Sequence, residues 1–133
     1  MKNKTVVYMI RDKKTYNFYN PVGSVKLWTS ENDYHISNKW KTFDTPYNKI
    51  KWMLWSINEY YPEAIKRARR EQNQTDVEYY ENAIKKESRI VANLEIVEYG
   101  VKDVIVEKNV FNVEVKKKKV KKYEYDYESI KNY

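Results

Sequence analysis

The chain has 133 residues, of which 41% are hydrophobic and 16% aromatic, enough for one domain with a sizeable core. Its formal net charge of +7 favours polyanionic partners, and the absence of cysteine excludes disulfides, thiolate chemistry and thiol-based zinc sites. No apolar run approaches the length of a membrane span and no signal-peptide pattern opens the chain, so we expect no membrane contact.

A strand hairpin is predicted at the start of the chain. Residues alternate along VVYMIR, the polar run RDKKT supplies a turn, and YNFYN returns. The segment PVGSV at residues 21–25 is a turn signal, and VKLWT after it predicts a further short strand. The segment KWKTF at residues 39–43 alternates again and predicts another.

Two or three helices are predicted in the middle of the chain. Thr45 can cap the first helix, and Pro46 suits a first helical position. An apolar stripe follows at helical spacing and predicts a buried face: Ile50, Met53, Leu54, Ile57 and Tyr61. Pro62 interrupts this helix and can start the next one.

The segment TDVE at residues 75–78 has the spacing of a capping box and opens a further helix. The apolar residues of that helix fall on one side: Val77, Tyr80, Ile84 and Val91. One continuous helix over residues 62–93 is the alternative.

From residue 94 the hydrophobic period changes to two. The runs LEIVEYGV, DVIVEK and VFNVEV predict three strands, with turns at Gly100 and at residues 108–109. The predicted fold class is α+β, with a small antiparallel sheet packed against two or three helices. We assign residues 1–115 to this domain and residues 116–133 to a basic, tyrosine-rich C-terminal arm.

The segment YMIRDKKT resembles the opening of small, uncharacterised proteins of tailed phages, which begin with a Tyr-x-Ile-Arg-Asn-Lys-x-Thr-Gly hairpin. The matching residues are Tyr8, Ile10, Arg11, Lys13 and Thr15. Residues 39–41, 45–57 and 95–99 are the counterparts of their later Lys-x-Trp strand, helix and EIVEY-like strand. Asp12 replaces the Asn, Tyr16 replaces the Gly, and residues 62–92 look inserted. The resemblance implies a phage origin and a ββαβ-type core, but no activity. From the absence of cysteine, of an apolar span and of a signal-peptide pattern we expect a protein of the host cytoplasm or the virion.

Nucleophilic and nucleotide-binding motifs are missing from the sequence. His35 is the single histidine, no Gly-x-Ser-x-Gly occurs, and two glycines cannot form a phosphate-cradling loop. A lone histidine in NDYHIS is typical of a surface loop.

The segment GVKDVIVEKNVFNVEVK resembles the D…E-x-K half-site of restriction-type nucleases, through Asp103, Glu114 and Lys116. The resemblance implies that the two carboxylates hold a divalent metal and that the lysine orients the attacking water, with Glu78 or Glu81 as an additional acid. However, too few residues follow Lys116 for the remaining helix and strand of that core. We therefore predict a structural hairpin, no enzyme activity and no metal or cofactor, and keep the metal-dependent nuclease as an alternative.

Two features favour phosphate binding. The helix segment AIKRARRE carries Lys66, Arg67, Arg69 and Arg70, and the tail carries Lys116, Lys117, Lys118, Lys119, Lys121 and Lys122. Tryptophans lie beside lysines, as in proteins that stack single strands, and Trp52 falls off the apolar stripe, so we expect it to be exposed. A solvated helix face and a tryptophan core are the alternatives.

The function that these features favour is that of a phage-type accessory protein. It would bind stoichiometrically to nucleic acid or to a host nucleoprotein complex, in host takeover or in defence inhibition such as anti-CRISPR activity. A small virion or assembly protein is an alternative, and self-association into a homo-oligomer stays open.

Overall fold

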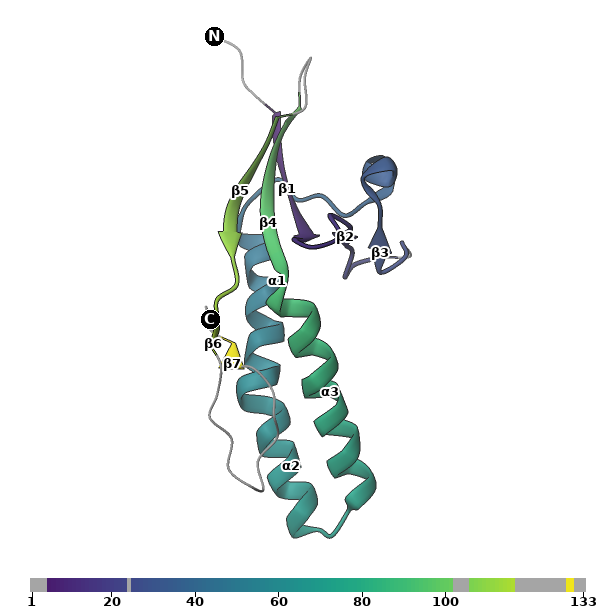
Figure 1. The fold of residues 1–133 in the computed structure, drawn as a ribbon, viewed down its shortest axis with the longest axis vertical. Coiled ribbons are helices and arrows are strands. Elements are labelled where there is room, and N and C mark those ends of the chain that lie inside the picture. Colours follow the sequence, from purple (N-terminus) through teal and green to yellow (C-terminus); the bar gives the residue numbers. More distant parts are fainter. Residues whose placement is uncertain (1–4, 24, 102–105, 117–128, 131–133) are drawn as a thin grey trace. The chain divides into compact units, whose positions relative to one another are not determined.

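The computed structural model describes residues 5–23, 25–101, 106–116 and 129–130 (Figure 1). The chain divides into two compact units. The sheet unit comprises residues 1–49 and 93–112, and the helical unit comprises residues 50–92 and 113–133. An antiparallel sheet together with helices confirms the predicted α+β class.

The sheet unit contains five strands in the order β3-β2-β1-β4-β5, all paired antiparallel. Their bounds are β1 Thr5–Asp12, β2 Phe18–Tyr19, β3 Trp28–Thr29, β4 Leu94–Val101 and β5 Val106–Asn112. β1 and β2 form the predicted hairpin, and its polar turn is held by the Asp12 carboxylate, which accepts the backbone N–H groups of Lys14 and Thr15 at 2.7 and 3.0 Å.

The same turn places Tyr16 in a strained backbone conformation. Tyr16 has φ 61°, in the left-handed region that favours glycine. Its ring lies under the Arg11 guanidinium, whose Cζ is 4.7 Å from the ring centroid, so this cation–π contact offsets part of the backbone strain.

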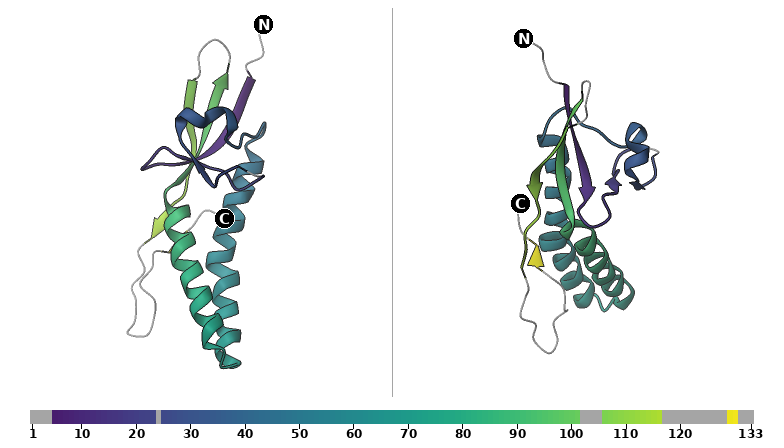
Figure 2. Two further views of the ribbon diagram at one scale, coloured as in Figure 1. Left: turned by 90° about the vertical axis from the view of Figure 1, so that its right-hand side faces the viewer. Right: turned by 45° about the horizontal axis from the view of Figure 1, so that its top comes forward.

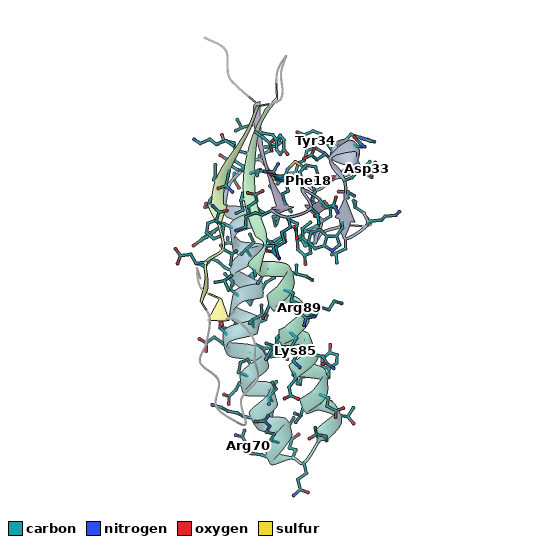
Figure 3. All side chains as sticks on the ribbon, viewed as in Figure 1. Phe18, Asp33, Tyr34, Arg70, Lys85 and Arg89 are labelled. Carbon is teal, nitrogen blue, oxygen red and sulfur yellow. The ribbon has the colours of Figure 1, made fainter. Side chains whose placement is uncertain are left out.

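Each face of the sheet carries a different cluster. Met9 pairs with Val97 on one face, where Phe18, Tyr99 and a short 3₁₀ helix, Glu31–Ile36, complete the core. In Figure 3, Tyr34 of this helix lies beside Phe18, with ring centroids 6.2 Å apart. On the other face Ile10 pairs with Ile96, and both are buried.

The helical run begins with α1, Asp44–Trp55, one residue before the predicted cap at Thr45. It continues through a π-helical turn, Ser56–Tyr60, into α2, Tyr61–Arg70, so Pro62 does not break the helix. The predicted stripe is confirmed as core, because Ile50, Leu54 and Ile57 are buried, with Met53 and Tyr61 half-buried.

α3, Gln74–Ala92, runs antiparallel to α2 and beside it in both views of Figure 2. The alternative of one helix over residues 62–93 is wrong, because Gln72 has φ 54° and turns the chain. The cap lies two residues before the predicted capping box: Asn73 Oδ1 accepts the Asp76 backbone N–H at 3.1 Å. As predicted, Val77, Ile84 and Val91 are buried, and Tyr80 is half-buried.

Several strand boundaries differ from the prediction. β4 runs through Gly100 and β5 runs through residues 108–109, so the turns predicted there are wrong. Asn109 stays in the strand because its side-chain amide donates to Glu95 on β4. KWKTF contributes a single bridge, Trp40 to Tyr8, and not a strand.

The third run, VFNVEV, ends β5 and continues into β6, Val115–Lys116, which pairs with β7, Ser129–Ile130. The arm predicted over residues 116–133 lies mostly outside the described residues, so its boundary stays a prediction.

Candidate nucleic-acid interface

Six aromatic side chains of the helical unit contact one another in series, and we call them the aromatic ladder: Trp52, Trp55, Tyr60, Tyr61, Tyr79 and Tyr80. The rings of Trp52 and Trp55 meet edge to face at 5.6 Å, and Trp55 stacks on Tyr60 at 5.7 Å with an interplanar angle of 26°. Tyr80 extends the series to α3, with its ring 6.4 Å from that of Tyr60 and 5.2 Å from that of Tyr79. The ladder therefore joins both arms of the helical hairpin.

The π-helical turn is what aligns Trp55 with Tyr60. Pro62 has no N–H to donate, and its ring would clash with the carbonyl four residues earlier in a regular α-helix. The wider turn directly before Pro62 avoids this conflict, and the Tyr61 N–H donates to the Ser56 carbonyl, five residues back. Because residues five apart share a face in such a turn, Tyr60 reaches the Trp55 ring.

The outer members of the ladder are exposed. The exposed fractions are 67% for Trp52, 41% for Trp55, 42% for Tyr60 and 66% for Tyr79. The prediction that Trp52 is exposed is therefore confirmed. Large aromatic side chains gathered at a surface mark a binding surface more often than isolated exposed ones do.

Three members of the ladder are fixed by hydrogen bonds. The half-buried Tyr61 donates its hydroxyl to Glu87 Oε2 at 2.6 Å, and burial together with this bond raises its pKa. Tyr60 and Tyr80 are joined by a side-chain hydrogen bond. These bonds tie the α2 and α3 sides of the ladder together, so its inner rings are held in place.

The four basic side chains predicted on α2, Lys66, Arg67, Arg69 and Arg70, are all exposed. They do not act as one stripe, because Arg69 lies toward Glu81 of α3, with an Nη2–Oε2 distance of 3.7 Å. The charge of Arg67 acts on the ladder: Tyr60 is the main cause that raises the pKa of Tyr80, and Arg67 acts in the opposite direction. Arg67 belongs to α2, which also carries Tyr61 of the ladder.

Sequence reasoning missed the basic side chains of α3. Lys85 and Arg89 are exposed and four residues apart, so they share one face, and Figure 3 shows both projecting from α3. Their spacing is the signal that could have found them. Residues 50–92 nevertheless carry eight basic and seven acidic side chains, so the positive charge of these helices is local.

The other predicted phosphate contacts lie in the tail. Lys116 belongs to β6, and Lys117, Lys118, Lys119, Lys121 and Lys122 lie outside the described residues. By sequence, residues 116–133 carry seven basic and three acidic side chains, the largest local excess of positive charge in the chain.

Arg11 is bound within the sheet unit and is not available to a phosphate. Its Nε donates to Glu95 Oε2 at 2.8 Å, and its Nη1 donates to Glu107 and to the Tyr99 hydroxyl. Burial alone would lower its pKa, but the hydrogen bonds to Glu95 and Glu107 raise it above the ordinary value. Arg11 therefore serves the fold.

The nuclease residues are only partly described. Asp103 lies outside the described residues, and Glu114 is exposed between β5 and β6. Of the two additional acids, Glu81 lies toward Arg69 and Glu78 is exposed. In the described part of the chain, no group of three or more His, Asp or Glu side chains is placed to hold a metal ion.

The sheet unit has two shallow hollows beside Glu31. One, of about 190 Å³, is lined by Phe18, Glu31, Tyr34, Tyr99 and Glu107. The other, of about 290 Å³, is lined by Thr15, Tyr16, Asn17, Ser30, Glu31 and Asn32. Both fall below the range of about 300–1,000 Å³ that is typical of small-molecule sites.

Comparison with protein families, curated proteins and solved structures finds no match to this chain. Within the ranges that the structure describes, no helix has the length and apolar character needed to span a membrane.

Proposed function

We propose that this protein acts by stoichiometric binding to nucleic acid, free or within a host nucleoprotein complex, without a catalytic step. The observation that carries the proposal is the exposed aromatic ladder, which reaches the basic helix α2 through Tyr61, because aromatic rings together with cations are the combination that binds polynucleotides independently of base sequence. The lysines of the tail would supply further phosphate contacts. In the phage setting that the N-terminal resemblance implies, such binding would serve host takeover or defence inhibition.

The salt dependence of binding tests this proposal. If four to six phosphates of a duplex are neutralised, log K should fall with log salt concentration at a slope of about −4 to −5. Changing the six lysines of residues 116–122 to glutamine, or removing residues 116–133, should flatten that slope. Binding that ignores salt, or that is unchanged without the tail charges, would contradict the role of the tail.

A pair of charge-matched variants separates the ladder from the rest of the helical unit. Arg67→Gln should reduce the slope by about 1, because one phosphate contact is lost. Lys85→Gln removes the same charge from a part of α3 turned about 140° away from Tyr80, and it should leave the slope unchanged. Equal effects of the two substitutions would mean that the charges act only through the overall field.

A role as a small virion or assembly protein is the second candidate, because exposed Trp and Tyr side chains are also enriched where proteins meet proteins. A concentration-dependent oligomer that dissociates on Trp52→Ala would favour it.

The proposal of no catalysis is tested by incubating DNA and RNA with the protein in Mg²⁺ or Mn²⁺. Cleavage that is lost in Asp103→Ala and Glu114→Ala would establish the nuclease instead.

A further inference from the structure

The exposed rings of the ladder offer flat apolar faces, and this restricts the kind of nucleic acid that can use them. In a duplex each base is covered by its neighbours about 3.4 Å away along the strand, so its face is closed to a protein ring unless the stack is opened. Opening it costs a few kcal/mol, whereas an unpaired strand presents its base faces already. The surface chemistry of Trp52 and Trp55 therefore fits unpaired bases.

The charges of the helices support the same conclusion. Residues 50–92 carry eight basic and seven acidic side chains, so the helices have little general attraction for a duplex. α2 is locally basic, with four cationic residues against the single carboxylate of Glu63. Arg67 lies on α2, as Tyr61 of the ladder does, and its charge acts on Tyr80, so it can hold the phosphate of a nucleotide whose base lies on the ladder.

We propose that the aromatic ladder is a binding site for unpaired nucleic-acid strands, with bases stacked on Trp52, Trp55 and Tyr60 and a phosphate held by Arg67. This inference rests on the proposed function and adds the substrate class. The π-helical turn is the positioning element of the site, because it brings Tyr60 onto Trp55 and so makes one continuous aromatic surface from α1 to α3.

The test compares fluorescein-labelled 20-nucleotide poly(dT) and poly(U) with a 20-base-pair mixed-sequence duplex, by fluorescence anisotropy at one low salt concentration. We expect both single strands to bind at least tenfold more tightly than the duplex and to quench tryptophan emission. Trp52→Ala should weaken single-strand binding by about 5- to 150-fold, the range expected for one lost base stack, and leave duplex binding within twofold. Trp52→Phe keeps a flat ring and should retain most of the affinity.

Leu27→Ala is the matched control, since Leu27 is also exposed (46%) but belongs to the sheet unit. It should change neither affinity. Circular dichroism of each variant should match the wild type, because an exposed side chain contributes little to folding.

The outcomes separate this inference from the function on which it rests. Equal binding to single strands and duplex, with tryptophan emission unchanged, would overturn the inference and leave nucleic-acid binding standing. No binding to any of the three probes would overturn both. Self-association that is lost in Trp52→Ala, without single-strand binding, would assign the ladder to a second copy of the chain and refute the inference.

Discussion

Removing the charge of Arg11 tests whether the sheet unit depends on its buried ion cluster. Arg11 and Glu95 are buried, with side chains 8% and 7% exposed, and they stand opposite each other on β1 and β4. In Arg11→Met, Glu95 keeps the amide of Asn109 but loses its only described ion-pair partner. Breaking a buried pair on one side costs about 3–5 kcal/mol, because a charge stays buried without compensation, and we expect this loss in the free energy of unfolding.

The reverse substitution should cost less. In Glu95→Met, Arg11 keeps its ion pair with Glu107 and its hydrogen bond to the Tyr99 hydroxyl, so a loss of about 1.5–3 kcal/mol is expected, the range for a hydrogen bond to a charged group. The double variant leaves no buried carboxylate without a partner and places two apolar side chains on the sheet. It should therefore be more stable than Arg11→Met alone.

Urea unfolding followed by circular dichroism measures the free energy of unfolding of the wild type, the two single variants and the double variant, which together form a double-mutant cycle. A loss below about 1 kcal/mol for Arg11→Met would refute the argument. Strict additivity of the two single substitutions would refute it equally, because contacting charges must show a coupling energy.

Three further predictions concern stability. Ile57→Ala should cost roughly 2–5 kcal/mol in urea melts, because Ile57 is 1% exposed and its truncation leaves a cavity; a cost below about 0.5 kcal/mol would place the helix surface outside the core. Burial and the Glu107 carboxylate raise the pKa of Tyr99 to about 12, so the fold keeps the phenol protonated, and the stability this gives is complete below pH 10 and lost between pH 10 and 12. The wild type should lose about 1–3 kcal/mol more than Tyr99→Phe across that range, and parallel losses would show that Tyr99 does not contribute. Asn73→Ala should cost about 0.5–2 kcal/mol through the lost cap of α3, whereas Gln74→Ala beside it should be nearly neutral.

The hydrophobic period of the sequence was sufficient to predict the fold class and most of the elements. The stripe through Ile50 and Ile57 and the alternation around Ile96 depend on side chains that are buried wherever the chain packs, so local pattern and final structure agree. Residues typical of turns predicted the strand boundaries less well. Gly100 and Asn109 suggested turns, but both are paired within the sheet, and a partner strand overrides a local preference.

The ion cluster around Arg11 could not be predicted from a local sequence pattern, because its members are far apart along the chain. Its members Glu95 and Glu107 are 84 and 96 residues away along the chain. Nothing in the sequence around Arg11 distinguishes a cation that serves the sheet from one that binds phosphate. The pairing of β1 with β4 and of β4 with β5 decides between them, because it brings both carboxylates to the guanidinium.

Helical periodicity predicted one part of the candidate site, the exposure of Trp52, but not the position of Tyr60. Trp52 was predicted to be exposed because it falls off the buried stripe of α1, and the structure agrees. Tyr60 could not be placed in the same way: five residues along a regular α-helix correspond to a rotation of about 140°, which would turn it away from Trp55. The π-helical turn before Pro62 removes that rotation and stacks the two rings. The residue that the sequence marks as a helix interruption is therefore the one that makes the aromatic surface continuous, and a surface built in this way is found only when the backbone around the proline is known.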